Sequence, residues 1–448
     1  MTTAAGTAPV PTGEASSPTA FRGRVLHFVA DPADAGERAH VFHEDGVLVV
    51  RDGRVVDSGA WNALANSLPA GTLVVDYRDK LILPGFIDTH IHYPQSDIIA
   101  SYGEQLLEWL DRYTFPTERR FADPAHAREV ASFFLDELLR NGTTTASIFA
   151  TVHPESVDAI FEEARARDMC VAAGKVLMDR NCPEFLRDTA ESGYEQSAAL
   201  IERWHGRERL LYAVTPRFAP TSTDRQLELA GRLLDEHAGV LAQTHVAENM
   251  DEVRWVTELF PWSRSYLDVY DHYGLLRHGA VYAHCIHLDR EDRRRMAESG
   301  ASMSFCATSN LFLGSGLFDL DAAHEHRVSV GIGSDVGGGT SFSMLRTLAE
   351  SYKVAQLARQ RLSPLRAFYL ATLGGARALA QEDRLGNFAT GKPADFVVLD
   401  PSATPLMARR MAHAEDLVET LFVLMMLGDD RAVAATYVKG EARWRRDS

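Results

Sequence analysis

Residues 81–95 read LILPGFIDTHIHYPQ. The stretch begins with an apolar run, which the pair Pro84-Gly85 interrupts, and it ends with His90 and His92. Because alternate side chains of a strand point to the same face, the two imidazoles should project together from one strand, about 6–7 Å apart along it. Two histidines at this spacing suit one first-row metal ion. The apolar run before them favours a buried strand end over a chance pair on an exposed loop.

The run at residues 81–91 is the first of eight apolar, β-rich runs, which alternate with amphipathic helical stretches such as residues 125–141 and 225–237. Eight such units over roughly 300 residues predict a parallel (β/α)₈ barrel, with its site at the carboxyl ends of the strands. A doubly wound open sheet is the alternative, but it would not bring together ligand-type residues that end several separated strands. The other seven runs are residues 143–150, 170–178, 210–215, 240–246, 280–284, 301–306 and 328–334.

Short strands precede and follow the barrel region, and Asp52-Gly53 is a typical hairpin turn between two of them. We expect both chain ends to build one small β-sandwich domain from residues 21–80 and 385–448, beside a barrel of residues 81–384. Residues 1–20, rich in Ala, Thr, Pro, Gly and Ser, are expected to be a disordered leader. The expected strands are residues 24–29, 46–51, 54–58, 72–77, 432–438 and 441–445, with further strand sequence in residues 386–402.

Composition excludes several classes of protein. The 448 residues are 46% hydrophobic, enough for one large α/β domain and a smaller one. A net charge of −16 argues against a nucleic-acid partner. The apolar run at residues 421–427 is far shorter than the ~20 residues of a membrane span. The N-terminus lacks the pattern of a signal peptide, and the four cysteines form no C-x-x-C pair. We therefore expect a cytoplasmic protein with reduced thiols.

Ligand-type residues end four of the predicted barrel strands. The fifth run leads into QTHVAEN, the sixth ends in a histidine, and the eighth leads into GSD. Three imidazole nitrogens and one carboxylate oxygen could hold Zn²⁺ and leave a place for water. Each residue alone is weak evidence, but four at matching strand ends are a strong signal. The candidate ligands are His90, His92, His245 and Asp335.

Two further residues could move protons. Glu248 lies three residues after His245, where a carboxylate could take a proton from metal-bound water and hand it on. His284 could hydrogen-bond the same water. The structural alternatives are a solvated glutamate at a helix start and a core histidine. His287, on the same loop as His284, is interpreted as structural.

Two other patterns point away from nucleotide loops and from cytidine deaminases. The glycine-rich residues 331–339 lack G-x-G-x-x-G spacing and are interpreted as backbone that gives room beneath a metal site. The sequence His413-Ala-Glu415 has no C-x-x-C partner, so the cytidine-deaminase signature is absent.

PGFIDTHIH, HVAE, the histidine of the sixth run and the GSD aspartate resemble the amidohydrolase superfamily over nearly the whole chain. The resemblance implies a metal-dependent barrel joined to a small β-domain from both chain ends. HVAE is similar to the mononuclear deaminase branch, which implies one Zn²⁺ per chain. Binuclear members use a carboxylated lysine late in a middle strand, whereas Lys175 comes early in its run, so a single metal is favoured.

Five blocks are similar, in order, to the guanine deaminase family: HIHYPQ, LLEWLDRYTFPTERRF, GKVLMDRNCPEFL, TPRFAPTS and SDVGGGTSFSM. The resemblance implies hydrolysis of guanine to xanthine and ammonia, a small-molecule substrate and a homodimer. It implies that Tyr93, where smaller residues are expected, alters the pocket rim. By the same resemblance, the proton-transfer residues are Glu248, His284 and Asp335, and the purine is held by Gln95, Arg217 and Phe218.

The chemistry of Arg217 would favour guanine over adenine. Its guanidinium can only donate, so it suits the O6 carbonyl of guanine and opposes the amino group of adenine. Gln95 could pair with the purine edge, and Phe218 could stack on the ring. The structural alternative is that Arg217 is an ion-paired residue of the barrel rim.

Two other functions stay open. One is a related hydrolase that acts on another N-heterocycle, such as an oxidised purine, a triazine or a cyclic amide. The other is a non-catalytic binding or scaffold protein, which is disfavoured because every ligand and proton-transfer position is filled.

Overall fold

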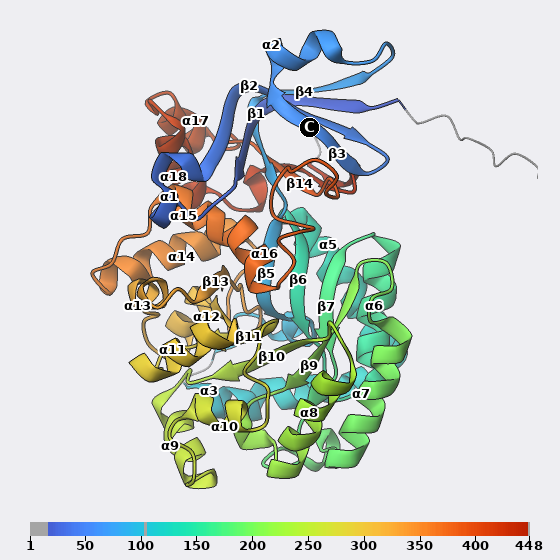
Figure 1. Cartoon of the computed structure of the whole chain (residues 1–448), viewed down its shortest axis with the longest axis vertical. Coiled ribbons are helices and arrows are strands. Elements are labelled where there is room, and N and C mark those ends of the chain that lie inside the picture. The colour runs from blue at the N-terminus through green and yellow to red at the C-terminus, as the bar shows by residue number, and fades with distance from the viewer. Residues whose placement is uncertain (1–16, 103–104, 447–448) are drawn as a thin grey trace, which may run out of the picture.

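The computed structural model describes residues 17–102 and 105–446. These residues form a small β-sheet, at the top of Figure 1, above a larger barrel. The predicted leader at residues 1–20 lies outside the described residues as far as residue 16, and Thr19 and Ala20 already belong to the first strand.

The small sheet has seven strands in the order β16-β15-β14-β4-β1-β2-β3, so both chain ends contribute to it, as predicted. The predicted Asp52-Gly53 turn joins β2 to β3, and both of its residues have positive φ, as tight hairpin turns require. The bounds are β1 Thr19–Phe28, β2 His40–Arg51, β3 Arg54–Ala60, β4 Leu73–Pro84, β14 Phe396–Leu399, β15 Val433–Val438 and β16 Glu441–Arg445.

The barrel consists of eight parallel strands that each overlap one predicted run, and the short β8 (Val176–Leu177) pairs with β9 beside them. The predicted (β/α)₈ architecture is confirmed. All but one of these strands are buried along their whole length or nearly so, which is why they read as continuous apolar runs. The bounds are β5 Phe86–His92, β6 Thr143–Phe149, β7 Cys170–Gly174, β9 Leu210–Pro216, β10 Leu241–Val246, β11 Ala280–His284, β12 Ser302–Phe305 and β13 Ser329–Ile332.

Helices follow most barrel strands and cover the outside of the barrel, as Figure 1 shows for α5 to α8. The predicted helices at residues 125–141 and 225–237 correspond to α5 and α8. The main helices are α5 Pro124–Arg140, α6 Pro154–Ala166, α7 Ala190–Trp204, α8 Asp224–Glu236, α9 Met250–Leu259, α10 Tyr266–His272, α11 Arg290–Ser299, α12 Ala307–Phe312, α13 Leu320–Glu325, α14 Met344–Leu357, α15 Pro364–Tyr369, α17 Pro405–Met411 and α18 Leu417–Leu427. The shortest are α1 Pro32–Ala35, α2 Trp61–Leu64, α3 Leu106–Trp109, α4 Phe115–Glu118 and α16 Gly375–Ala378.

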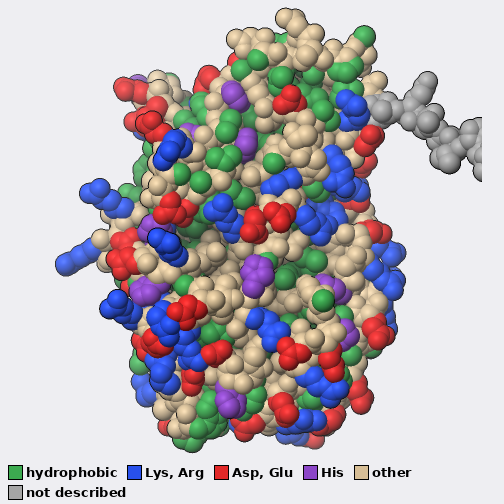
Figure 2. Space-filling model, viewed as in Figure 1, with side chains coloured by type: hydrophobic (Ala, Val, Ile, Leu, Met, Phe, Trp, Pro, Cys, Tyr) green, Lys and Arg blue, Asp and Glu red, His purple; other side chains and the backbone are tan. Residues whose placement is uncertain are grey.

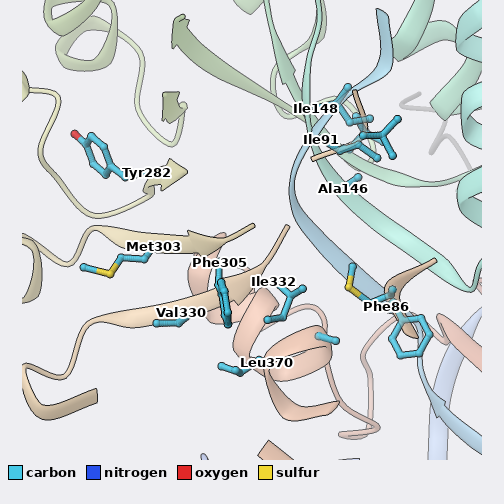
Figure 3. Close-up of a cluster of buried hydrophobic side chains, with 14 of the residues drawn as sticks. Phe86, Ile91, Ala146, Ile148, Tyr282, Met303, Phe305, Val330, Ile332 and Leu370 are labelled. Atoms are coloured by element: carbon cyan, nitrogen blue, oxygen red, sulfur yellow. The ribbon is translucent and has the colours of Figure 1, made fainter. Parts of the chain in front are cut away.

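The main core lies between the barrel strands and the surrounding helices. Figure 3 shows Ile91 of β5 beside Ala146 and Ile148 of β6, all fully buried. Elsewhere in the same cluster, Phe305 and Ile332 lie on the neighbouring strands β12 and β13. Alternate residues of each strand point outward into this core. The residues between them point to the opposite face, toward the barrel interior.

The stretch at residues 81–91, which the sequence predicts as one strand, is two strands. Residues 81–84 end β4 and pair with β14 in the small sheet, whereas β5 begins at Phe86 in the barrel. Gly85 lies between them: its N–H donates to the carbonyl of Asp395 (3.0 Å), and the next N–H donates to Gly142 (3.0 Å). The run is apolar throughout because one end is buried in each part of the protein.

Polar contacts join the last barrel strand to the first. The backbone N–H of Ser334 donates to Asp88 Oδ1 (3.0 Å), and its hydroxyl donates to the other carboxylate oxygen. The backbone N–H of Asp335 donates to the carbonyl of His90 (2.9 Å). These bonds fix the residues after β13 against β5.

Acidic and basic side chains are interspersed over the face of the molecule in Figure 2. A mixed surface of this kind accords with the overall net charge of −16 and offers no basic patch on that face. Among the described residues, no helix is both long and apolar enough to cross a membrane.

We predict that Gly85→Ala destabilises the protein by about 1–3 kcal/mol, the usual cost of overpacking a core. A Cβ at Gly85 would lie 2.2 Å from Oγ1 and 2.4 Å from Cγ2 of Thr144, at the point where the chain passes from sheet to barrel. Thermal unfolding measures the loss. Thr144→Ala should restore part of it, and Gly59→Ala, which meets only the flexible end of Leu64, should cost less. An unchanged melting temperature in Gly85→Ala would refute this account.

Candidate active site

Three imidazoles converge at the carboxyl ends of β5 and β10. His92 Nε2 lies 3.3 Å from His90 Nε2 and 3.1 Å from His245 Nε2. Asp335 Oδ1, just beyond β13, lies 3.4 Å from the Nε2 atoms of His90 and His92. Burial lowers the pKa of each of the three histidines well below its usual value. All three are therefore neutral near pH 7, the form that binds a metal.

This donor set fits a zinc ion. Ligands placed tetrahedrally at 2.0–2.1 Å from Zn²⁺ are themselves roughly 3.3 Å apart. This is close to the 3.1–3.4 Å that separate His92 from the other two imidazoles and Asp335 from His90 and His92. The four residues that the sequence predicts as ligands are thus brought together. Cys306 is near a second side of the cluster, with His90, His284 and Asp335. Burial raises the pKa of its thiol well above the usual value, which makes it a poorer ligand.

A backbone contact on the Nδ1 side of the ring fixes the orientation of the His245 imidazole. Its Nδ1 lies 2.6 Å from the backbone carbonyl of Arg217. Because a carbonyl can only accept, Nδ1 must carry the proton, and the lone pair of Nε2 faces the other histidines. A partner of this kind commonly orients a metal-binding imidazole.

Glu248 and His284 lie beside the histidine cluster and are both nearly fully buried, which excludes a solvated glutamate. Glu248 Oε1 accepts a hydrogen bond from Ser315 Oγ (2.9 Å), and its Oε2 lies 3.4 Å from His284 Nε2. Burial, together with the charge of Asp335, raises the pKa of Glu248 to about 8. His284 Nδ1 lies 2.8 Å from Asn310 Oδ1, an acceptor, so its Nε2 faces the two carboxylates.

Strained backbone accompanies these side chains. Ala247, His284, Cys285 and Asp335 all have positive φ, between 50° and 70°, at the ends of β10, β11 and β13. Residues with a Cβ rarely adopt this conformation, and such strain clusters at functional sites. Of these four residues, His284 and Asp335 carry side chains that face the cluster.

A pocket opens beside the cluster and contains every predicted purine-binding residue. Gln95 and Phe218 are 2% and 4% exposed and both line it. Arg217 lines it too, yet its Nη1 is 2.9 Å from each carboxylate oxygen of Glu118. Arg217 is therefore both ion-paired and exposed to the pocket. Apolar side chains complete the lining: Leu106, Trp109, Leu110 and Leu313.

Sequence reasoning missed two buried carboxylates. Glu252 accepts hydrogen bonds from the backbone N–H groups of Glu248 (3.0 Å) and Asn249 (3.1 Å) and from the hydroxyl of Tyr266 (2.6 Å). The capping pattern Asn249-x-x-Glu252 could have revealed it. Glu118 contacts a residue ninety-nine positions away, and its one signal in the sequence is that it stands within the block LLEWLDRYTFPTERRF.

Three residues that the sequence analysis discussed lie apart from the site. Tyr93, expected at the pocket rim, is wholly buried in the core, where its hydroxyl donates to the carbonyl of Ser156 (2.7 Å). It is the first residue of the 3-10 helix Tyr93–Ile98 that follows β5, and its ring packs against Phe121 and Phe134. Lys175 is buried in an ion pair with Asp188, away from the histidines. His287 contacts the carbonyl of Ser315 and does not line the pocket.

The glycine-rich residues 331–339 give room beneath the cluster, as predicted. A Cβ at Gly333 would lie 2.9 Å from the Cβ of His90 and 2.5 Å from Ser304 Oγ. A Cβ at Gly337 would lie 1.9 Å from Gln95 Oε1. Larger residues here would displace side chains of the site.

Comparisons with known proteins agree with this geometry. The amidohydrolase family matches residues 81–443. The chain is 55% identical over 406 residues to guanine deaminase of Escherichia coli K12, which covers 91% of this chain and 92% of that protein. The structure is similar to E. coli guanine deaminase (TM-score 0.94, 53% identity, 96% and 100% coverage). It is also similar to guanine deaminase from C. acetobutylicum with guanine bound in the active site (TM-score 0.85, 28% identity, 95% and 100% coverage).

We predict that Glu248→Gln stabilises the metal-free protein at pH 8.5 but not at pH 5. The folded pKa of Glu248 is about 8, above the usual 4.5, so the folded state holds its proton more tightly than the unfolded state. The contribution of this proton to the free energy of unfolding is complete below the unfolded pKa, and it is lost as the pH rises through about 8. Glutamine mimics the protonated form and does not titrate, so the variant keeps this contribution, which is on the order of a few kcal/mol of unfolding free energy.

Thermal melts of the chelator-treated proteins across this pH range measure the difference. Glu258→Gln, at an exposed position on the same helix α9, is the matched control and should follow the unmodified protein. Parallel pH dependences for Glu248→Gln and the unmodified protein would contradict the burial argument.

Proposed function

Because the chain belongs to the amidohydrolase family, we propose that it hydrolyses guanine to xanthine and ammonia. The similarity to guanine deaminases over most of the chain supports this activity. The composition of the pocket also supports this activity. Arg217 and Gln95, suited to the edge of a purine, line the same pocket as Glu248, beside the histidine cluster.

We propose one Zn²⁺ per chain, held by His90, His92, His245 and Asp335. Bound there, the ion would polarise a water molecule and lower its pKa to about 7. The spacing of the four donor atoms supports this assignment, and the ion pair of Lys175 with Asp188 argues against a second, lysine-bridged metal.

Glu248 would carry the proton. As the water oxygen bonds to C2 of guanine, Glu248 accepts a proton from it and delivers a proton to ring N3. Glu248 then passes the remaining proton of that oxygen to the amino group, the C2–amino bond breaks, ammonia leaves, and a carbonyl remains at C2 of xanthine. The raised pKa of Glu248 suits it to hold a proton, and nearby positive charge would bring that pKa closer to neutral. His284, 3.4 Å from Glu248 Oε2 and 3.8 Å from Asp335 Oδ2, would hydrogen-bond the water.

The pocket would hold the purine by its edge and its face. Arg217 would donate to O6, Gln95 would pair with N1, and Phe218 would stack on the ring. Adenine presents an amino group where guanine has O6, so it would leave buried polar groups unpaired. A site built for hydrogen bonding can reject such a mismatch by ~10⁴ or more.

We also propose a cytoplasmic homodimer that acts in guanine catabolism. The catalytic barrel would span residues 85–384 and the small domain residues 19–84 and 385–448, because residues 81–84 pair with β14 in the small sheet and β1 begins at Thr19. The alternative function is hydrolysis of another N-heterocycle, and the assay described next distinguishes it from hydrolysis of guanine.

The test is an assay of the purified protein with guanine. We expect xanthine and ammonia in equal amounts, and elemental analysis should give about one zinc per chain, as a single four-ligand site requires. Activity on a triazine or cyclic amide without activity on guanine would overturn the proposal. Two tightly bound ions per chain would overturn the single-metal site.

The same assay tests the role of Glu248. Glu248→Gln keeps the size of the side chain but removes its basic group, so turnover should fall by about 10²–10⁴, the usual contribution of general acid–base catalysis. Zinc content should stay unchanged, because Glu248 is not a proposed ligand. Turnover near that of the unmodified protein would assign the proton transfer to another residue.

A further inference from the structure

The loop that carries Glu248 is held by a second glutamate, to which the proposed mechanism gives no role. Glu252, in the first turn of α9, is fully buried. Its Oε2 accepts hydrogen bonds from the backbone N–H groups of Glu248 (3.0 Å) and Asn249 (3.1 Å). The carboxylate of Glu248 has other partners, His284 and Ser315. Glu252 therefore acts on the main chain of Glu248 and not on its carboxylate directly.

The backbone of this loop is strained, so its conformation depends on the contacts around it. Ala247, the residue before Glu248, has a φ of 50°, which residues with a Cβ rarely adopt. Such a conformation persists only where the surrounding structure holds it. The carbonyl of Ala247 accepts from the backbone N–H of His287 (3.0 Å), and Glu252 holds the two N–H groups that follow. The strained residue is thus held on both sides.

Helix α10 supports both ends of the same loop. Tyr266 and Tyr270 lie one helical turn apart in α10, and both are buried. The hydroxyl of Tyr270 donates to the backbone carbonyl of His245 (2.8 Å). The hydroxyl of Tyr266 donates to Glu252 Oε1 (2.6 Å). One helix therefore contacts both a proposed metal ligand and the carboxylate that holds Glu248.

We propose that Glu252, supported by Tyr266, is a positioning residue that fixes where the Glu248 carboxylate lies relative to the histidine cluster. This inference rests on the proposed function, in which Glu248 moves protons between water and the purine. A group that transfers protons must lie within hydrogen-bonding distance of the atoms it serves, and a displacement of about 1 Å can lower a rate by about 10². The contacts of Glu252 are to the protein, so the effect should fall on turnover more than on guanine binding.

Two conservative variants separate the position of this carboxylate from its charge. Glu252→Gln keeps the length of the side chain: its oxygen can accept from the two backbone N–H groups, and its amide N–H can donate to the hydroxyl of Tyr266. Glu252→Asp keeps the charge but is one methylene shorter, so it cannot reach the N–H groups and Tyr266 together. A positioning role spares the glutamine variant and impairs the aspartate variant, whereas a role of the charge gives the opposite order.

The experiment measures kcat and KM for guanine, together with zinc content and thermal unfolding, in the unmodified protein and in both variants. We expect kcat to fall about 10–100-fold in Glu252→Asp and no more than about threefold in Glu252→Gln. KM should change little, because the lost interaction acts in the transition state, and zinc content should not change. Equal kcat in all three proteins, a larger loss in Glu252→Gln than in Glu252→Asp, or a change confined to KM would overturn the inference.

Tyr266→Phe tests the same arrangement if Glu252→Asp does not fold. It leaves Glu252 in place and removes only the hydroxyl that donates to Oε1. We expect kcat to fall by about 2–10-fold, the usual worth of one hydrogen bond, with KM and zinc content little changed. An unchanged kcat in Tyr266→Phe would contradict the proposed support of Glu252.

A matched control separates the positioning of Glu248 from the capping of a helix. Asp292 caps α11 as Glu252 caps α9, is 2% exposed, and accepts from Ser265 Oγ (2.6 Å) and from the backbone N–H of Asp289 (3.4 Å). Asp292→Ala should lower the melting temperature and leave the kcat of the folded, zinc-loaded protein unchanged. A fall in kcat equal to that of Glu252→Asp would attribute the effect to the loss of any buried cap, and the role of Glu252 would be refuted.

The assay of the unmodified protein keeps the two proposals distinct. If that protein releases no ammonia from guanine, the proposed function fails and this inference fails with it. If that protein is active, the variants test Glu252 alone.

Discussion

The contact on which the site most depends is the one between Asp88 and the backbone after β13. Asp88 is fully buried, and its carboxylate accepts hydrogen bonds from both the N–H and the hydroxyl of Ser334. The next residue, Asp335, donates its N–H to the carbonyl of His90. The first and eighth strands of the barrel meet here, and the same bonds place the Asp335 carboxylate 3.4 Å from two imidazoles. Closure of the barrel and assembly of the donor set are therefore one structural event.

Burial in the site shifts the protonation of its histidines and glutamates away from what they would have in water. Burial keeps the histidines neutral and raises the pKa of Glu248 to about 8 and that of Glu252 to about 7. Left-handed backbone at four strand-end residues adds strain. Each of these features costs stability, and the surrounding barrel core supplies the rigidity that maintains them. A divalent ion would offset part of the cost, because it favours both the neutral imidazoles and the ionised carboxylates.

The sequence predicted the elements that depend on local periodicity. Eight apolar runs became eight strands, and strand parity placed His90 and His92 on one face. Tyr93, expected at the pocket rim, lies in the core, in the 3-10 helix that begins directly after β5, where strand parity no longer applies. The Pro84-Gly85 interruption was visible in the sequence, but the division of the run into two strands escaped prediction because both halves are apolar, each buried in a different part of the protein. Glu118 escaped because its role depends on a contact with Arg217 far along the chain, which periodicity does not report.

The most direct test of this account is the zinc dissociation constant of Asp88→Ala, measured by competition with a chelator. Asp88 touches no proposed substrate and is not a proposed ligand, but it holds the residue next to Asp335. We expect the affinity for zinc to fall by about 10–100-fold, as it does when the groups that orient metal ligands are removed. Asp188→Asn, which alters a partly buried carboxylate elsewhere, should retain the affinity of the unmodified protein. An unchanged dissociation constant in folded Asp88→Ala would contradict the claim that closure of the barrel assembles the metal site.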